Sequence, residues 1–301
     1  YAYEEGVFQV VLKPNEGITS SFINHYALNH DKDIFILEQD FDELNSRLKS
    51  QLTKLTRSLS IGNIEKNATK QVNLLTMQMA NLYNDPYNDE LLTNQFQNSK
   101  NLGILLYNNK AIQKNIYHNL SKQKYHYTHK QPLLTSIMLL SYLQNLNLFS
   151  ETEIQTLFLT SYFKDIGMSF IPREKFDLAV LSEFDKKLFS EHAENSMKIL
   201  EGRVPMNQTQ LNIIKNHHYL NYKIQSMARG EDVIPDEEYL SGIESSLLAS
   251  IDILVAMTTE RPYRKAMTSF KALELLKKVL PDEYPQEFKT LVFFLKNFFS
   301  K

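Results

Sequence analysis

The amino-acid sequence predicts a mainly α-helical protein, in which an all-helical domain follows a small α/β or helical N-terminal domain. Two observations predict this fold. From residue 42 onward, apolar residues recur every three or four positions, the pattern of amphipathic helices. Between His129 and Arg264, histidines and aspartates stand on or beside such patterns, separated by segments of helical length. Because these groups are costly to bury without a partner, we expect them to converge on a metal site.

The composition is that of an ordinary globular protein, with 301 residues, 43% hydrophobic and 23% charged. The net charge of -2 gives no general attraction to nucleic acid polymers or acidic membranes. The absence of cysteine excludes disulfides and thiolate ligands, so a metal must be bound by nitrogen and oxygen atoms. No apolar run reaches the roughly 18 residues of a membrane span, and the N-terminus lacks signal-peptide features. We therefore expect a cytoplasmic protein without a membrane span.

The N-terminal part combines short strands with amphipathic helices. Residues 7–14 and 33–38 are rich in β-branched and aromatic residues, which favours strands. We place a domain boundary near residue 110, so residues 1–110 form a domain of regulatory or dimerising role and residues 111–301 form the second domain. Two apolar stripes indicate packing within the domain or a homodimer through these helices: Leu44, Leu48, Leu52, Leu55 and Leu59, then Val72, Leu75, Met79 and Leu82.

The second domain is almost entirely helical in pattern. Ser182, with Asp185 three residues later, is a capping signal for a helix expected to carry His192. On that helix, His192 would share the inward face of Leu188. Helical patterns cover residues 133–145, 151–163, 182–201, 209–218, 245–258 and 269–279.

Asp252 is the most informative single residue. Its segment, residues 247–257, is apolar around almost the whole helix circumference, which predicts a buried helix. The carboxylate then needs a cation, several hydrogen bonds or a raised pKa. An ion pair with Arg261 or another buried base would suffice, but metal binding is the stronger interpretation because the chain offers matching partners.

The partners are one aspartate and four histidines. Asp165 follows another apolar helix, residues 157–163. The adjacent His217 and His218 diverge by about 100° on a helix, so they reach one site only over a helix end, or else serve two ions. Asp165 could bridge two ions, which would activate a water and bind a phosphate oxygen. The set suits iron, manganese or zinc: His129, Asp165, His192, His217, His218 and Asp252.

A basic turn follows Asp252 at short range. Arg261, Pro262, Arg264 and Lys265 could form a rigid phosphate-binding turn, since guanidinium groups bind phosphate through two hydrogen bonds. Alone, such a turn is usually a solvated surface. Its position after a buried aspartate favours phosphate binding at the mouth of a metal site.

These motifs resemble an HD-GYP domain, a branch of the HD phosphohydrolase superfamily whose active members hydrolyse cyclic di-GMP. The resemblance covers roughly residues 120–280 and implies an all-helical HD fold with a variable preceding domain. It also implies two divalent ions, iron first and manganese next, held by the six ligands above, with phosphate contacts at Arg261 and Arg264. The matching segments are 127–129, 164–167 with 171–172, 191–192 with 197–200, 216–218, 229–235, and 252 with 261–267.

The chain also departs from this family. The paired His-Asp is here Lys164-Asp165, and the lysine could pair with Asp165 or Asp252 in place of a metal's charge, or bind metal when deprotonated. Met168 stands where members often carry a lysine, and residues 220–228 replace the Gly-Tyr-Pro loop. Tyr125, four residues before His129, does not favour an additional ion.

The sequence is compatible with three functions. The first is a slow cyclic di-GMP phosphodiesterase, with Asp165 at the metals and Lys164 as the one candidate proton donor. The second is a receptor or interaction module that binds cyclic di-GMP or a signalling protein without turnover. The third is hydrolysis of another phosphorylated nucleotide.

Overall fold

The computed structural model describes residues 1–13, 16–19, 22, 25, 34–229, 242–278, 280 and 284–299. The chain forms two compact units, residues 1–51 and residues 52–301. In the described part of the chain, no helix combines the length and the apolar character needed to cross a membrane.

The first unit begins with a two-stranded antiparallel hairpin, β1 (Ala2–Glu4) and β2 (Val7–Gln9). Glu5 and Gly6 have φ angles of 50° and 84°, the left-handed conformation that a two-residue hairpin turn of type I′ requires at both positions. The strand expected over 7–14 is shorter in the structure, because β2 ends at Gln9. The strand expected over 33–38 is wrong for its described residues: Ile34 makes only an isolated bridge to Ala2, and Glu38–Asp40 is the 3-10 helix η2.

The second unit is helical, which confirms the fold class predicted from the sequence. The boundary between the two units falls within α2 (Phe41–Arg57), which carries most of the first leucine stripe. The further helices are α3 (Ile64–Asn84), α4 (Asp89–Asn108), α5 (Lys110–Ser121), α6 (Tyr127–Leu146), α7 (Glu151–Phe163), α8 (Glu183–Ser190), α9 (His192–Leu200), α10 (Gln208–Asn216), α11 (Tyr219–Arg229), α12 (Ile243–Thr258), α13 (Ser269–Leu276) and α14 (Pro285–Phe299), with the 3-10 helices η3 (Ile166–Phe170) and η4 (Arg173–Lys175).

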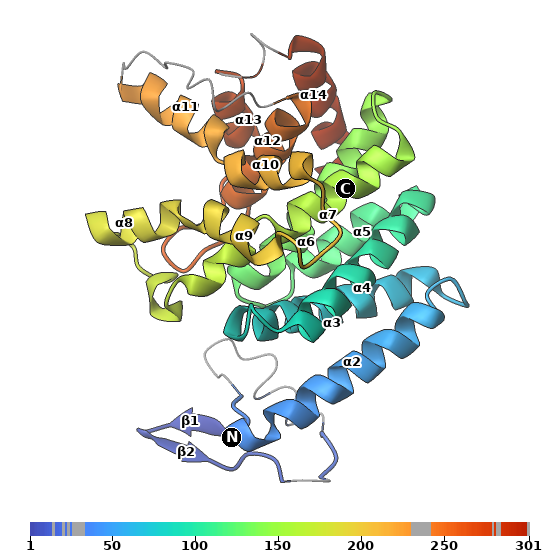
Figure 1. The fold of residues 1–301 in the computed structure, drawn as a ribbon, viewed down its shortest axis with the longest axis vertical. Coiled ribbons are helices and arrows are strands. Elements are labelled where there is room, and N and C mark those ends of the chain that lie inside the picture. The colour runs from blue at the N-terminus through green and yellow to red at the C-terminus, as the bar shows by residue number, and fades with distance from the viewer. Residues whose placement is uncertain are drawn as a thin grey trace. The chain divides into compact units, whose positions relative to one another are not determined.

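Helices α6 and α7 pack against each other at the centre of this unit (Figure 1). Both are apolar around most of their circumference, so nearly every residue of α6 from Tyr127 to Leu143 is buried. Helices α3, α4 and α5 cover one side of the pair, and α10, α12 and α14 cover another. This packing holds the ends of α7 and α10 and the middle of α12 beside the start of α6, which positions the site.

The division into compact units does not fall at residue 110. Helix α3 packs on α5 and α6, and α4 packs on α7, so residues 64–121 belong to the same core as the later helices. The second apolar stripe serves this packing, since Val72, Leu75, Met79 and Leu82 are all buried in that core. A separate regulatory role for residues 1–110 stays a prediction.

The segment expected to form one helix over 182–201 is two helices. The predicted cap is present, because Ser182 and Asp185 form a capping box at the start of α8. The chain then turns at Glu191, and the His192 Nδ1 donates to the Phe189 carbonyl at the break, 2.5 Å away. His192 therefore opens α9, and its burial comes from this new helix rather than from a face shared with Leu188.

Candidate metal centre and its pocket

Lys164 and Asp165 follow directly on the buried helix α7. Lys164 is its C-cap residue, and Asp165 precedes the 3-10 helix η3. Helix α9 lies very close to η3, since a Cβ at Gly167 would stand 2.1 Å from the His192 carbonyl oxygen. The Gly167 amide donates to Ser196 Oγ at 2.8 Å, which fixes this approach. Only glycine fits here, and the contact brings His192 to Asp165.

Backbone carbonyls orient two of the histidines. His192 Nδ1 donates to Phe189 O at 2.5 Å, and His217 Nδ1 donates to Ile214 O at 2.6 Å. A carbonyl only accepts, so in the neutral form of either ring the proton lies on Nδ1 and the lone pair on Nε2. This is the arrangement in which histidines bind metals, with the second nitrogen held by a hydrogen bond.

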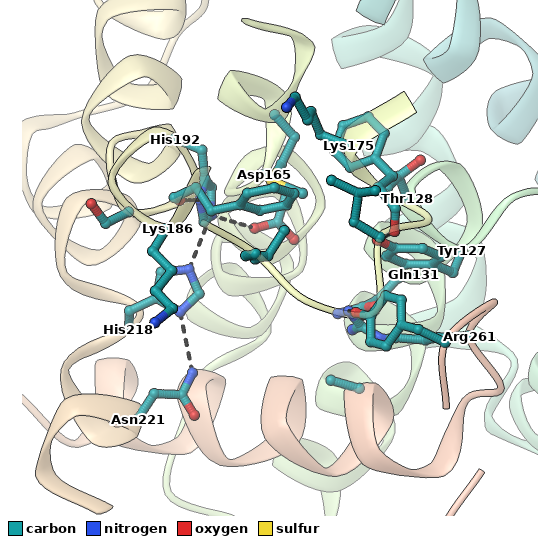
Figure 2. Close-up of a pocket in the computed structure, with 18 of the residues that line it drawn as sticks. Tyr127, Thr128, Gln131, Asp165, Lys175, Lys186, His192, His218, Asn221 and Arg261 are labelled. Carbon is teal, nitrogen blue, oxygen red and sulfur yellow. Dashed lines mark hydrogen bonds and ion pairs between the residues drawn. The ribbon is translucent and has the colours of Figure 1, made fainter. Parts of the chain in front are cut away.

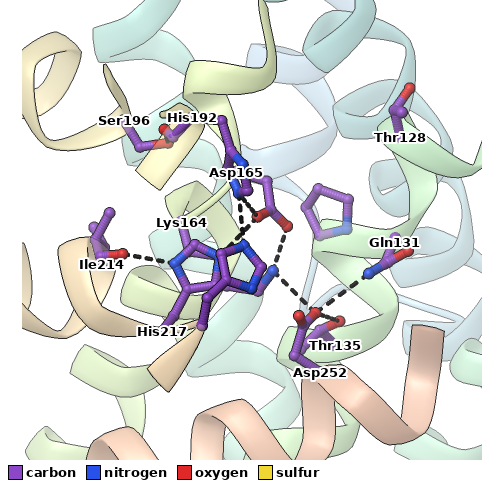
Figure 3. A network of polar contacts seen from close by, with 12 residues as sticks. Thr128, Gln131, Thr135, Lys164, Asp165, His192, Ser196, Ile214, His217 and Asp252 are labelled. Carbon is purple, nitrogen blue, oxygen red and sulfur yellow. Dashed lines mark hydrogen bonds and ion pairs between the residues drawn. The ribbon is translucent and has the colours of Figure 1, made fainter. Parts of the chain in front are cut away.

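Four ligand atoms converge on one point (Figures 2 and 3). One atom each from Asp165, His192, His217 and His218 forms a group within 4.8 Å. The His192 and His217 Nε2 atoms lie 3.3 and 3.2 Å from Asp165 Oδ1, and the His218 Nε2 lies 3.0 Å from that of His192. The two adjacent histidines meet because α10 ends at Asn216, so both lie over the helix end.

The donor set fits a divalent ion. The His217 Nε2 is buried and has no hydrogen-bond partner of good geometry, although the Asp165 carboxylate is near. Burial lowers the pKa of His217, and burial together with the two neighbouring imidazoles lowers that of His218 well below its usual value. Although burial raises it, the charge of the adjacent Lys164 holds the pKa of Asp165 well below its usual range. Neutral imidazoles and an ionised carboxylate are what a metal requires.

Lys164 lies between the two aspartates, as Figure 3 shows. Its ammonium contacts Asp165 Oδ2 and lies 2.9 Å from Asp252 Oδ1. The side chain is only 1% exposed, and although burial disfavours its charge, the two carboxylates raise its pKa. The buried Asp252 is thus paired with a base, but the base is Lys164 and not Arg261. Two further donors, from Gln131 and Thr135, reach the same oxygen at 3.3 and 3.4 Å.

His129 and Asp252 are outside the four-atom group found among the described residues. The His129 ring instead packs edge-on against Tyr83, with ring centroids 5.3 Å apart. Burial, together with the neighbouring His126 and Arg173, lowers its pKa to about 4, so the ring is neutral at pH 7. Of the six expected ligands, the structure brings four together.

A cavity of about 1000 Å³ opens beside the four ligands. In the view of Figure 2, His192 and His218 appear on one side and Tyr127, Gln131 and Arg261 on the other. Its remaining walls include aromatic rings and lysines: Tyr83, Phe176, Phe189, Tyr222, Tyr263, Lys175, Lys186 and Lys187.

The three basic residues of the expected phosphate-binding turn have different surroundings. Arg261 lines the cavity, with its guanidinium 4.5 Å from the centre of the Tyr127 ring and its Nε without a hydrogen-bond partner. Arg264 donates to the carbonyls of Ala256 and Met257 at the end of α12, at 2.7 and 3.1 Å, and does not line the cavity. Lys265 is exposed and outside it. Residues 230–235 belong to the segment 229–235 that resembles the family, and they lie outside the described residues.

Sequence reasoning missed several polar residues of the site. Gln131 bridges Asp252 and Arg261, and Asn221 contacts His218 Nδ1 at 3.2 Å. A signal for Gln131 and Thr135 exists in the sequence, because they are four residues apart and so share a face of an apolar helix. Asn221 carries no such signal, since its contact depends on how α10 meets α11.

Comparisons with known proteins agree with this geometry. A profile of the HD domain family matches residues 112–284, more than half of the chain. Among solved structures, Bd1817, an HDG"Y"P protein from Bdellovibrio bacteriovorus, is similar with a TM-score of 0.65 and 15% identity, over 98% of this chain and 94% of that one. At this identity the likeness shows a shared fold. A search of curated proteins finds no match.

The family match and the histidine–aspartate cluster support a metal-dependent phosphohydrolase. The sequence motifs that resemble an HD-GYP domain, without the Gly-Tyr-Pro segment, lie within the residues that the HD domain profile matches. The chain belongs to the HD domain family.

Proposed function

We propose that this protein is a metal-dependent phosphodiesterase that hydrolyses cyclic di-GMP or a related cyclic dinucleotide. The observation that carries the proposal is the convergence of Asp165, His192, His217 and His218 beside a cavity that also holds Arg261. A divalent ion bound there would lower the pKa of a coordinated water and polarise a phosphoryl oxygen. We expect iron, and next manganese, from the nitrogen and oxygen donors and from the family resemblance.

The cavity suits an anionic nucleotide with flat bases. Its volume of about 1000 Å³ is at the upper end of ordinary ligand sites. Arg261 lines the cavity and offers a guanidinium charge to a phosphate, and the lysines of the wall add positive charge. Tyr222 and Tyr263, both exposed by more than a third, offer ring faces on which a base could stack.

The residues of the chain then have distinct tasks. Arg261 orients the phosphate, and the rings hold the bases, so that water attacks phosphorus and one P–O ester bond breaks to give a linear dinucleotide. Arg264 is already engaged by the end of α12, so Arg261 rather than Arg264 or Lys265 carries the phosphate contact. Lys164 does not line the cavity and acts through the two aspartates.

A second candidate is a receptor that binds the nucleotide without cleaving it. The observation that favours it is the buried Lys164, because a family ligand is replaced by an ammonium. Hydrolysis of another phosphorylated nucleotide is tested by the same assay with other substrates. A cytoplasmic location, signalling proteins as partners and a homodimer through the N-terminal helices stay predictions.

The experiment loads protein purified without oxygen with iron(II) or manganese(II) and incubates it with cyclic di-GMP. We expect a linear dinucleotide or GMP by chromatography, and no product from a matched His217→Gln variant. Calorimetry on the same samples measures binding. Binding of a nucleotide that stays intact would support the receptor, and the absence of both binding and cleavage, for this substrate and for a panel of other nucleotides, would refute the proposal.

A further inference from the structure

The second ion expected from the family resemblance does not fit the described site. Its ligands would be His129, Asp165 and Asp252, but an ammonium stands between the two carboxylates. The Lys164 Nζ contacts Asp165 Oδ2 and lies 2.9 Å from Asp252 Oδ1. A divalent ion that shared these oxygens would lie in contact with the ammonium, in a buried site where like charges repel strongly.

The two oxygens of Asp165 have separate partners. Its Oδ1 faces the Nε2 atoms of His192 and His217, at 3.3 and 3.2 Å, while its Oδ2 faces Lys164. The carboxylate therefore has one oxygen for a metal and one for the ammonium. In the two-ion arrangement, Asp165 Oδ2 would have to bind the second ion, and the Lys164 ammonium would lose this partner.

One oxygen of Asp252 is also engaged by other partners. Its Oδ1 accepts hydrogen bonds from Lys164, Gln131 and Thr135. The donors come from α6 and from the end of α7, two buried helices that hold them in place. His129, the remaining expected ligand, packs on Tyr83 and is outside the group of convergent ligand atoms.

We propose that the centre binds one divalent ion, through Asp165, His192, His217 and His218, and that the Lys164 ammonium replaces the second ion. This inference rests on the proposed metal-dependent function and concerns the same site. Lys164 is a positioning residue, since it is 1% exposed and holds both aspartates from behind the cavity wall. Asp165 then links an ion to an ammonium, where the family arrangement would link two ions.

The test counts metal ions per chain by elemental analysis, after anaerobic purification and loading with iron(II) or manganese(II). We expect one ion in the natural protein. In Lys164→His, the introduced imidazole would complete a second site with His129, Asp165 and Asp252, so we expect the count to rise to two. Circular dichroism on each sample shows whether the variant is folded.

A second variant keeps the test decisive if Lys164→His does not fold. Asp252→Asn removes a carboxylate that belongs only to the second site, so the one-ion centre predicts no change in the count. Two ions in the natural protein, with one lost in Asp252→Asn, would overturn the inference. No bound ion in the folded natural protein would overturn it as well.

The count is independent of the nucleotide assay. One ion per chain without cleavage of any nucleotide would leave the one-ion centre standing and refute the phosphodiesterase. Cleavage by a protein with two ions per chain would support the phosphodiesterase and refute the one-ion centre.

Discussion

The Arg261 guanidinium donates a hydrogen bond from Nη2 to the side-chain oxygen of Gln131, 2.7 Å away. The amide nitrogen of Gln131 in turn donates to Asp252 Oδ1 at 3.3 Å. The direction follows from chemistry, because an ionised carboxylate only accepts and a guanidinium only donates. One buried side chain thus connects the proposed phosphate-binding residue to the ion pair of Lys164.

Replacing Gln131 by methionine should weaken nucleotide binding without removing the metal. The variant keeps the side-chain length but loses the acceptor that holds Arg261, and a hydrogen bond to a charged group contributes about 1.5 kcal/mol or more. We expect the Kd for cyclic di-GMP to rise about tenfold in calorimetry. An unchanged Kd, or a loss of bound metal, would show that Gln131 does not act through Arg261.

Two histidines of the expected ligand set should respond differently to the same substitution. His217→Gln removes one of four convergent ligands, so we expect bound iron or manganese to fall to a small fraction of the natural content. His129→Gln is the matched control and should keep its metal, because His129 is outside the ligand group. Loss of metal in both variants would show that His129 is a metal ligand as well.

Gly167→Ala should disturb the metal site through the backbone. The added Cβ would stand 2.1 Å from the His192 carbonyl oxygen and 2.5 Å from the Ser196 amide nitrogen, both backbone atoms. Helix α9 must move away, so we expect a loss of about 1–3 kcal/mol in the free energy of unfolding and weaker metal binding. Ser196→Ala removes the hydrogen bond that Ser196 accepts from Gly167 and the one that it donates to the His192 carbonyl, but it adds no bulk, so it should have the smaller effect in urea unfolding. Equal effects would contradict the steric explanation.

The sequence predicted the parts of the site that depend on local pattern. Helices α7 and α12 were expected almost at their observed ends, because apolar residues cover nearly all of their circumference and indicate burial. The buried Asp252 was expected to need a cation, and its partner Lys164 was one of the alternatives considered. Such predictions hold because a buried charge can be stabilised in only a few ways.

What depends on packing between distant segments could not be predicted in the same way. Gln131 and Asp252 are 121 residues apart and meet only because α6 packs on α12. The break before His192 was missed because the apolar pattern continues across it. The engagement of Arg264 by α12 was missed because a basic turn has the same sequence whether it faces a ligand or a helix end.

His129 should make stability depend on pH. Its pKa is lowered to about 4 by burial and by the neighbouring His126 and Arg173, whereas the unfolded value is about 6.5. Below about pH 6.5 the unfolded chain binds a proton that the folded ring does not, so the free energy of unfolding falls as the pH falls towards about 4.

Urea unfolding at pH 7 and pH 5, with a chelator present, measures this effect. Between these values the natural protein should lose about 2 kcal/mol more than His129→Gln, since the remaining groups titrate in both proteins. Equal losses in the two proteins would mean that His129 is accessible to protons in the folded state.

Anomalous diffraction from crystals of the iron- or manganese-loaded protein tests the central claim most directly, because it locates each ion. We predict one peak, within about 2.5 Å of the Nε2 atoms of His192, His217 and His218 and of Asp165 Oδ1. No peak should lie between Asp165 and Asp252, where the Lys164 ammonium stands. A second peak at that position, or no peak at the histidines, would contradict the account.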